Sequence, residues 1–443
     1  VLTRSKRIFT TYMRNITLLF IVLSSSVFAQ TSIHDVSLLL AKHKYNKVFR
    51  CFDDNMKSKV SKEQLSTLWE QLESTVGQYK EVKNVKTTSL DEGIKQKGLL
   101  QFEAGALEMA LSTNGEGKIS GLFISQLGYE APEYAKNLGT GKKYTNFESH
   151  GYNIPGELVI PLECNECPLV VLVHGSGPND KDETIGPNKV FYDLAMGLAS
   201  KGVATYRYDK RSNIYPETLK GQFDLYDETI NDAVSALLHI QKDTSLHFGK
   251  YVMLGHSLGA YAMPLIADSL GDLINGAILF SGNSSRLEDL IDYQMEYLTS
   301  FDGEISKAEA KIIKENTERA QNIRTNNYTD STSAELLLGY WPGKFWKGID
   351  NYSPVSTLSA NKNMPFFIMQ GEMDYQIPMS EYKIWQDVVG TQPNVTMRSY
   401  PGLSHLFTPT KAEKPSPQDY FSPNNVDFQV IWDMSDWIKL VAK

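Results

Sequence analysis

The sequence predicts a fold of the α/β class, with a doubly wound, mostly parallel sheet and a small α+β domain before it. Three observations support this prediction. The 443 residues are enough for two or three domains at ~100–200 residues each. In the second part of the chain, short continuous apolar runs alternate with helical patterns, as in sheets that are buried on both faces. The first part instead has helical patterns followed by alternating strands.

The composition is that of an ordinary folded protein, with 41% hydrophobic and 22% charged residues. The 44 basic and 52 acidic residues give a formal net charge of −8. Because binding to phosphates needs a basic surface, we expect no nucleic-acid partner. The sequence alone does not specify an oligomeric state.

Residues 1–30 have the pattern of a secretory signal peptide. Basic residues without any acidic ones precede the apolar stretch Ile16–Leu23, and a small-residue pattern ends at Ala29. Cleavage near Ala29 or Gln30 would export the protein to the periplasm or the medium. A membrane span needs ~20 apolar residues, so we expect none after cleavage. Because the chain opens with Val and not Met, we expect either an alternative start codon or a true start further along, and Met13-Arg14-Asn15 would make a tidier basic region.

Residues 31–127 form the predicted small domain. Ser61–Gln64 followed by apolar residues at helical spacing predicts a capped amphipathic helix. Strands are expected at 82–88, 98–104, 106–112 and 119–125, with Asn114-Gly115 as a hairpin signal. The segments Asp53–Met56, Ser61–Leu65 and Trp69–Leu72 resemble a domain of unknown function that precedes catalytic domains in secreted bacterial proteins, so a structural or binding role is expected.

A linker is predicted at 128–146, and the α/β domain at 147–443. Its expected strands are Leu158–Ile160, Leu169–Val173, Val203–Tyr208, Val252–Leu254, Ala277–Phe280, Phe366–Met369 and Val395–Tyr400. An insertion at about 285–360 has helical spacing and no strand signal, and we expect it to form a lid that excludes water. Aromatic residues at its end would line a substrate cleft or pack on the core: Tyr340, Trp341, Phe345 and Trp346. The loop Pro415–Pro423 is a second segment that could overhang a site.

Ser257 is the candidate nucleophile, because Gly255-His256-Ser257-Leu258-Gly259 follows a predicted strand and precedes a helix. A sharp turn in this context strains the serine backbone and exposes the hydroxyl group, and both glycines are needed to avoid clashes. An isolated motif of this kind is often only a glycine-rich turn.

A serine hydroxyl needs a base, and histidine has a suitable pKa. Of eight histidines, His405 lies in a glycine-containing loop between the last strand and the last helix. The imidazole in turn needs a carboxylate to orient it. Asp374, in the loop after the strand Phe366–Met369, is our choice, with Glu372 as the fallback.

The segment His174-Gly175-Ser176-Gly177-Pro178 follows a strand, and its small residues let N–H groups approach an oxyanion. We assign the oxyanion hole to the N–H groups of Ser176 and Leu258, each worth about 3–4 kcal/mol of the barrier. We expect His174 to buttress this loop.

Together with His174–Asp180, Arg207–Arg211 and the order Ser, acid, His, these motifs resemble the α/β-hydrolase superfamily over roughly residues 144–443. The likeness is to bacterial esterases and serine-aminopeptidase-like hydrolases. The resemblance implies an acyl-enzyme mechanism on a small-molecule ester or acyl substrate, with no metal or organic cofactor. The charged residues Asp180, Asp209, Lys210 and Arg211 would brace the oxyanion loop or, less favoured, recognise a charged substrate.

Two alternatives to a secreted serine esterase stay open. A serine peptidase or amidase would use the same three side chains, and a non-catalytic envelope binding protein would use none of them. Cys164 and Cys167 lack a second pair of metal ligands, so a local disulfide or two idle thiols is expected.

Overall fold

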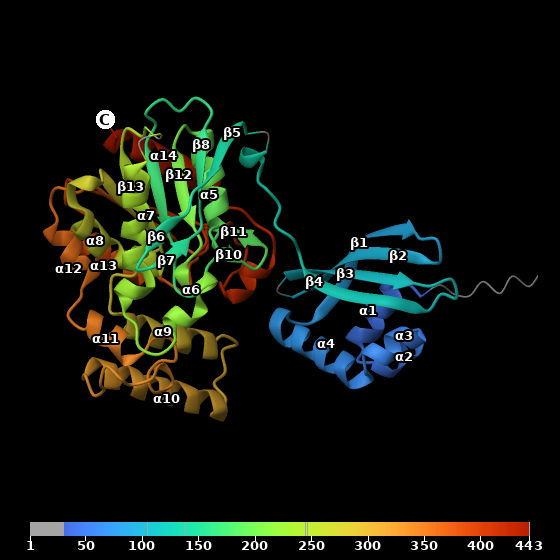
Figure 1. Ribbon diagram of the computed structural model, residues 1–443. Helices are drawn as coiled ribbons and strands as arrows, with labels where there is room; N and C mark the ends of the chain where they lie inside the picture. The colour runs from blue at the N-terminus through green and yellow to red at the C-terminus, as the bar shows by residue number, and fades with distance from the viewer. Residues whose placement is uncertain (1–30, 104, 137, 244, 246, 443) are drawn as a thin grey trace, which may run out of the picture. The chain divides into compact units, whose positions relative to one another are not determined.

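The computed structural model describes residues 31–103, 105–136, 138–243, 245 and 247–442. The predicted signal peptide lies outside the described residues. Within them, no helix combines the length and apolar character that crossing a membrane requires. The first part of the chain forms a small helix-and-sheet region and the rest forms a large α/β region (Figure 1), which confirms the predicted fold class.

The small region begins with helices and continues as a sheet in which each strand pairs with the next. Its elements are α1 (Ile33–Ala41), α2 (Tyr45–Cys51), α3 (Asp54–Lys59), α4 (Lys62–Val76), β1 (Tyr79–Ser89), β2 (Ile94–Phe102), β3 (Gly105–Thr113) and β4 (Ile119–Gln126). The predicted capping of α4 is confirmed, because the Ser61 hydroxyl accepts from the Gln64 N–H at 3.1 Å and the Gln64 side chain accepts from the Ser61 N–H at 2.8 Å.

The large region is built on an eight-stranded sheet with the order β16-β15-β14-β13-β9-β12-β8-β5. The strands are β5 (Thr140–Tyr144), β8 (Gly156–Pro161), β9 (Leu169–Val173), β12 (Ala204–Tyr208), β13 (Tyr251–His256), β14 (Gly276–Phe280), β15 (Phe366–Gly371) and β16 (Val395–Tyr400). All pairs from β12 to β16 are parallel, whereas β8 is antiparallel to both of its neighbours. Every strand predicted from an apolar run is present.

Strand β5 differs from the prediction, because Thr140–Tyr144 was expected to be linker. It pairs with β8 as an edge strand, from Thr140 opposite Pro161 to Tyr144 opposite Glu157. An edge strand needs no apolar run, because its pairing comes from the backbone, and no side chain of β5 is buried on either face. Lys142 and Lys143 therefore concealed this strand in the sequence.

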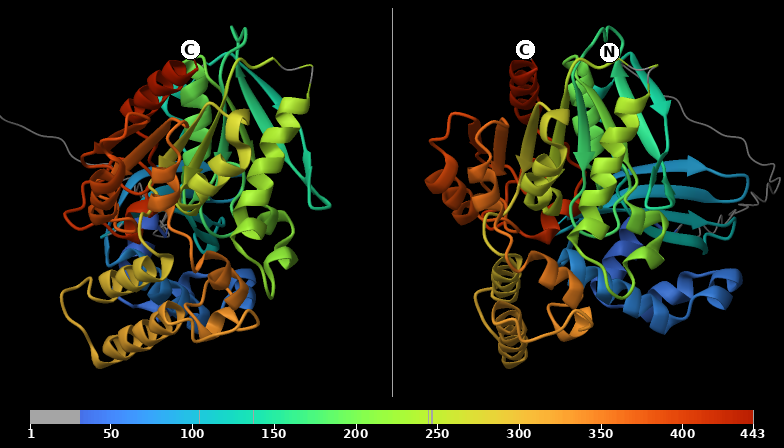
Figure 2. Two further views of the ribbon diagram at one scale, coloured as in Figure 1. Left: turned by 90° about the vertical axis from the view of Figure 1, so that its left-hand side faces the viewer. Right: turned by 60° about the vertical axis from the view of Figure 1, so that its left-hand side comes forward.

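Alternating side chains of the sheet supply two apolar cores. In β9, Leu169, Val171 and Val173 pack in the core on one face, and Val170 and Leu172 in the core on the other. The first core includes residues of α7 (Asn231–Lys242), α8 (Leu258–Leu270), α12 (Pro354–Ala360) and α13 (Met379–Val389). The second includes residues of α5 (Val190–Ser200) and α14 (Phe428–Val441). The sheet is thus covered by helices on both faces (Figure 2).

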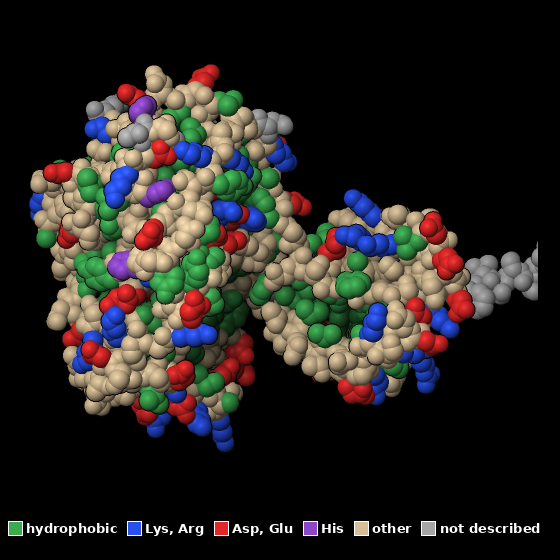
Figure 3. All heavy atoms as spheres, viewed as in Figure 1, with side chains coloured by type: hydrophobic (Ala, Val, Ile, Leu, Met, Phe, Trp, Pro, Cys, Tyr) green, Lys and Arg blue, Asp and Glu red, His purple; other side chains and the backbone are tan. Residues whose placement is uncertain are grey.

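The predicted insertion is helical, with α9 (Leu287–Thr299), α10 (Lys307–Arg324) and α11 (Gly343–Ile349) gathered at one end of the large region (Figures 1 and 2). The remaining elements of the large region are short: η1 (Glu133–Ala135), β6 (Phe147–Ser149), β7 (Tyr152–Ile154), β10 (Thr184–Ile185), β11 (Asn188–Lys189), α6 (Arg211–Ile214), η2 (Pro216–Leu219), η3 (Tyr226–Ile230), η4 (Gly271–Leu273), η5 (Ala334–Leu336) and η6 (Pro417–Phe421). On the face shown in Figure 3, basic and acidic side chains are interspersed.

The cysteine pair forms a disulfide between Cys164 and Cys167. It lies in the connection from β8 to β9, before the amino end of β9. Of the two readings left open, the local disulfide is the one present, and neither sulfur is available as a thiolate ligand.

Candidate active site

Ser257 lies at the turn between β13 and α8, with φ 53° and ψ −115°. Such a left-handed backbone is rare outside glycine and marks a strained position. A Cβ atom added to Gly255 would lie 2.2 Å from the carbonyl oxygen of Gly259, and one added to Gly259 would lie 2.4 Å from that of Val173. Both glycines are therefore required for the sharp turn that presents the Ser257 side chain at the carboxyl edge of the sheet.

His405 and Asp374 are joined by a hydrogen bond. The Nδ1 atom of His405 lies 2.7 Å from Oδ2 of Asp374. The other carboxylate oxygen accepts from the N–H groups of Gln376 and Ile377 at 2.8 and 2.9 Å. These contacts fix a buried carboxylate so that it orients the imidazole ring.

Glu372, the fallback acid, is not part of this arrangement. Its side chain is exposed and accepts a hydrogen bond from the Ser399 hydroxyl at 2.8 Å. Of the two acids in the loop after β15, only Asp374 contacts His405.

Ser257 is not bonded to His405 in this structure. Among the described residues, neither the Ser257 hydroxyl nor the Nε2 atom of His405 has a hydrogen-bond partner. The neighbouring ring of His256, however, packs against that of His405, with the centroids 4.7 Å apart and the ring planes tilted by 39°. The two predicted side chains thus come from adjoining segments at the same edge of the sheet.

In the loop after β9, buried acids accept from the N–H groups on either side of Ser176. The N–H of Gly175 donates to Glu183 at 2.7 Å, and that of Gly177 donates to Glu228 at 3.2 Å. Between them, the N–H of Ser176 makes no hydrogen bond to another described residue. A Cβ atom on Gly175 would approach the Cβ of Ser257 to 3.2 Å, so this loop lies directly beside the nucleophile candidate.

His174 packs beneath this loop in the protein interior and supports it, as expected. Its ring is 1% exposed, packs against Phe191 and Tyr208, and its Nε2 atom lies 3.1 Å from the carbonyl oxygen of Asp180. Burial lowers the pKa of His174 to about 4, so the ring is neutral near pH 7.

The charged residues of the loops after β9 and β12 contact other groups of the protein. Lys210 donates to the carbonyl oxygen of Gly175 at 2.7 Å, and Arg211 forms a buried ion pair with Asp232. Asp209 accepts from the N–H of Lys181 at 2.8 Å. Asp180 accepts from the backbone and side chain of Thr184. These contacts favour bracing of the loop over recognition of a charged substrate.

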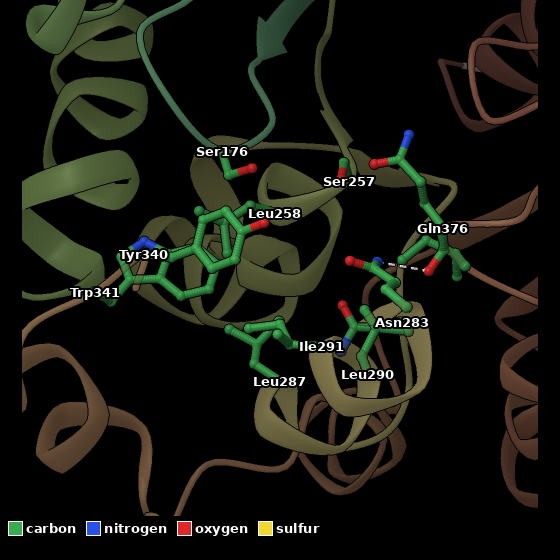
Figure 4. Close-up of a pocket in the computed structure, with 12 residues that line it drawn as sticks. Ser176, Ser257, Leu258, Asn283, Leu287, Leu290, Ile291, Tyr340, Trp341 and Gln376 are labelled. Carbon is green, nitrogen blue, oxygen red and sulfur yellow. Dashed lines mark hydrogen bonds between the residues drawn. The ribbon is translucent and has the colours of Figure 1, made fainter. Parts of the chain in front are cut away.

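A cavity of about 120 Å³ opens beside Ser257 (Figure 4). It is lined by Ser176, Ser257, Leu258, Asn283, Leu287, Leu290, Ile291, Gln294, Tyr340, Trp341, Gln376 and Ile377. Figure 4 shows Ser176, Ser257 and Gln376 along one rim, with Leu287 and Ile291 across the cavity. Of the four aromatic residues considered from the sequence, Tyr340 and Trp341 line the cavity. Phe345 and Trp346 are buried in the core.

The cavity lining brings together Ser257, Ser176 and Leu258, the three residues assigned to nucleophile and oxyanion hole. Leu258 is the first residue of α8, and its N–H has no acceptor among the described residues. The loop Pro415–Pro423 reaches the same rim through the Tyr420 hydroxyl, which accepts from the Gln376 side chain at 2.9 Å.

Sequence reasoning missed Glu183 and Glu228, the two buried acids that bind the loop N–H groups. No motif surrounds either acid. Their burial and their contacts arise only in the folded chain, so the sequence offers no signal that would have singled them out.

Comparisons with known proteins agree with this architecture. Residues 167–409 match the family described as serine aminopeptidase, S33, and residues 35–122 match a domain described as a protein of unknown function (DUF3887). Esterase EstD of Thermotoga maritima is 30% identical over 407 residues, covering 90% of this chain and 92% of that protein.

Two solved structures show the similarity at lower identity. Est1E from Butyrivibrio proteoclasticus is 16% identical, with a TM-score of 0.42 over 67% of this chain and 98% of that one. Proline iminopeptidase from Mycobacterium smegmatis is 13% identical, with a TM-score of 0.43 over 68% and 99%. From the family match and the esterase relative, we conclude that the chain belongs to the S33 serine aminopeptidase family of α/β-hydrolases.

Proposed function

We propose that this hydrolase is exported and cleaves carboxylic esters through an acyl-enzyme intermediate formed on Ser257. The observation that carries the proposal is the hydrogen-bonded pair of His405 and Asp374 at the same sheet edge as the strained turn of Ser257.

In the proposed reaction, the Ser257 oxygen attacks the ester carbonyl carbon while His405 takes the hydroxyl proton through Nε2. The carbonyl oxygen becomes negative and accepts from the N–H groups of Ser176 and Leu258. When the C–O bond breaks, the leaving alcohol receives the proton from His405. Water then attacks the acyl-serine with His405 as base, which releases the acid and restores Ser257.

The cavity lining supports esters over aminoacyl amides. An aminopeptidase must bind the free α-ammonium group of its substrate, for which a carboxylate is the usual partner. The described residues that line the cavity include no Asp, Glu, Lys or Arg. Its volume of about 120 Å³ is below the ~300–1,000 Å³ of pockets for drug-sized ligands. We therefore infer a short, uncharged acyl group. The esterase relative supports the same choice.

The test is covalent labelling and turnover of the Ser257→Ala variant. We expect a fluorophosphonate to label the unmodified protein and not the variant, and hydrolysis of p-nitrophenyl propionate to be lost only in the variant. Continued turnover by Ser257→Ala would refute the proposed mechanism. Export is tested separately by N-terminal sequencing of the protein recovered outside the cytoplasm, where a start near residue 30 is expected.

A further inference from the structure

A second acid and imidazole pair lies directly behind the proposed catalytic residues. Oε2 of Glu183 lies 2.9 Å from Nδ1 of His256, and Nε2 of His256 lies 3.0 Å from the backbone carbonyl oxygen of His405. Glu183 also accepts the N–H of Gly175 through Oε1 at 2.7 Å. The side chains of Glu183, His256 and His405 are 2%, 1% and 3% exposed.

Both ring nitrogen atoms of His256 face oxygen atoms that can accept a hydrogen bond. A carbonyl oxygen can only accept, so Nε2 must carry a proton. The carboxylate of Glu183, when ionised, also only accepts, and in that state Nδ1 carries a proton as well. Burial alone would lower the pKa of His256, but the charge and hydrogen bond of Glu183 raise it overall. His256 in turn lowers the pKa of Glu183 despite burial. The contacts and the directions of both pKa shifts favour an imidazolium–carboxylate pair.

This pair connects three segments that the reaction needs. His256 directly precedes Ser257, its Nε2 atom holds the backbone of His405, and its partner Glu183 holds the residue before Ser176. Along the chain, His405 lies 149 residues after His256, and His256 lies 73 residues after Glu183. A buried ion pair with a purely structural role need not contact the backbone of catalytic segments. This pair does so beside the proposed nucleophile, base and oxyanion donor.

We propose that Glu183 and His256 are positioning residues. They hold the loop that carries His405 and the loop that carries Ser176 in place relative to the turn at Ser257. The inference rests on the proposed function, because it takes His405 as the base and Ser176 as an oxyanion donor. The contact from His256 to the His405 carbonyl oxygen is the one that acts on the base. A displacement of about 1 Å in a catalytic group can cost on the order of 100-fold in rate.

Two substitutions of His256 separate its two nitrogen atoms. In His256→Gln, the amide nitrogen can occupy the place of Nε2 and still donate to the His405 carbonyl oxygen. In His256→Asn, the amide nitrogen occupies the place of Nδ1 and retains only the contact to Glu183. With p-nitrophenyl propionate, we expect kcat to fall on the order of 100-fold in His256→Asn and by less than about 10-fold in His256→Gln. KM should change little in either variant.

The control is His239→Asn, a replacement on α7 of a histidine that bonds Thr145 and lies outside the proposed site. It should leave kcat unchanged. Thermal unfolding of each variant distinguishes a variant that is unfolded from one that is folded but has displaced catalytic groups. Equal losses of kcat in His256→Asn and His256→Gln at similar melting temperatures, or a change confined to KM, would overturn the inference.

Glu183 provides a second pair of variants if those of His256 do not fold. Glu183→Gln can still accept from Gly175 and donate to a neutral His256, so kcat should fall less than about 10-fold. Glu183→Ala loses both contacts, and its kcat should fall on the order of 100-fold. A wild-type kcat in Glu183→Ala would refute the positioning role. Turnover that survives in Ser257→Ala would instead refute the proposed function, so the two failures are distinguishable.

Discussion

The ammonium group of Lys210 lies 3.0 Å from the carboxylate of Glu228, and both side chains are buried. Lys210 also donates to the carbonyl oxygen of Gly175, and Glu228 accepts from the indole N–H of Trp341 at 2.6 Å. One ion pair therefore connects the loop after β9 to an aromatic wall of the cavity. This relationship explains why a lysine after β12 braces the site without facing substrate.

Replacing Lys210 should destabilise the protein strongly. In Lys210→Met, the Glu228 carboxylate stays buried without its cation, which typically costs about 3–5 kcal/mol. Urea unfolding should show that loss in the free energy of unfolding. The exposed Lys220→Met variant should unfold like the unmodified protein, and a Lys210→Met variant of unchanged stability would contradict this account.

Asp374→Asn should fold normally but lose turnover by roughly 10³–10⁴-fold, because an amide favours the wrong imidazole tautomer of His405. Steady-state kcat with p-nitrophenyl propionate measures this effect. Glu372→Gln is the matched control, since its side chain bonds Ser399 instead. A larger loss in Glu372→Gln than in Asp374→Asn would reverse the choice of acid.

A carboxylate placed in the cavity should change substrate preference. Glycine and propionic acid p-nitrophenyl esters have acyl groups of nearly equal shape and differ by one positive charge. Gln376 lies at the rim beside Ser257 (Figure 4) and bonds the Tyr420 hydroxyl, which can equally donate to a carboxylate. In Gln376→Glu, we expect kcat/KM for the glycine ester to rise about 10-fold relative to the propionate.

The control for this change is Gln386→Glu, which adds the same charge at an exposed position of α13. It should not alter the ratio of the two kcat/KM values. If the unmodified protein already prefers the glycine ester, the inference of an uncharged acyl group is wrong.

Asp193 should make stability depend on pH. Burial raises its pKa to about 6, although Tyr129 and the N–H of Val426 donate to it. A carboxyl group with a raised pKa in the folded state adds stability below its unfolded pKa of about 3.9, and this contribution is lost as pH rises through about 6. The loss should amount to roughly 3 kcal/mol between pH 4 and 7.

Asp193→Asn isolates this contribution, because an amide does not titrate. As pH rises from 4 to 7, the unfolding free energy of the unmodified protein should fall relative to that of Asp193→Asn. A difference that stays constant over this range would show that Asp193 does not titrate as described.

Removing the disulfide should lower stability without affecting turnover. Cys164 and Cys167 close a loop with a sequence separation of 3, for which chain entropy predicts a contribution of about 2 kcal/mol. The bond lies before the amino end of β9, whereas the site lies at the carboxyl edge of the sheet. The Cys164→Ser/Cys167→Ser variant should therefore unfold more easily and keep its kcat, and a fall in kcat would contradict this separation.

Local patterns in the sequence were sufficient for much of the fold. Runs such as Leu169–Val173 predicted strands because burial on both faces requires continuous apolar residues. The glycines around Ser257 predicted the sharp turn, because the crowding that excludes a Cβ atom arises within a few residues. Asp374 and His405 could be selected because each follows a predicted strand, and parallel strands end at one edge.

Tertiary structure decided what no local pattern encodes. The edge strand β5 depends on pairing with β8 and needs no apolar residues. The choice between Asp374 and Glu372 depends on which carboxylate turns toward His405. The contacts from Glu183 to His256 and on to His405 join residues distant in the chain. Buried polar groups take partners wherever folding places them, so their pairing follows from the packed structure.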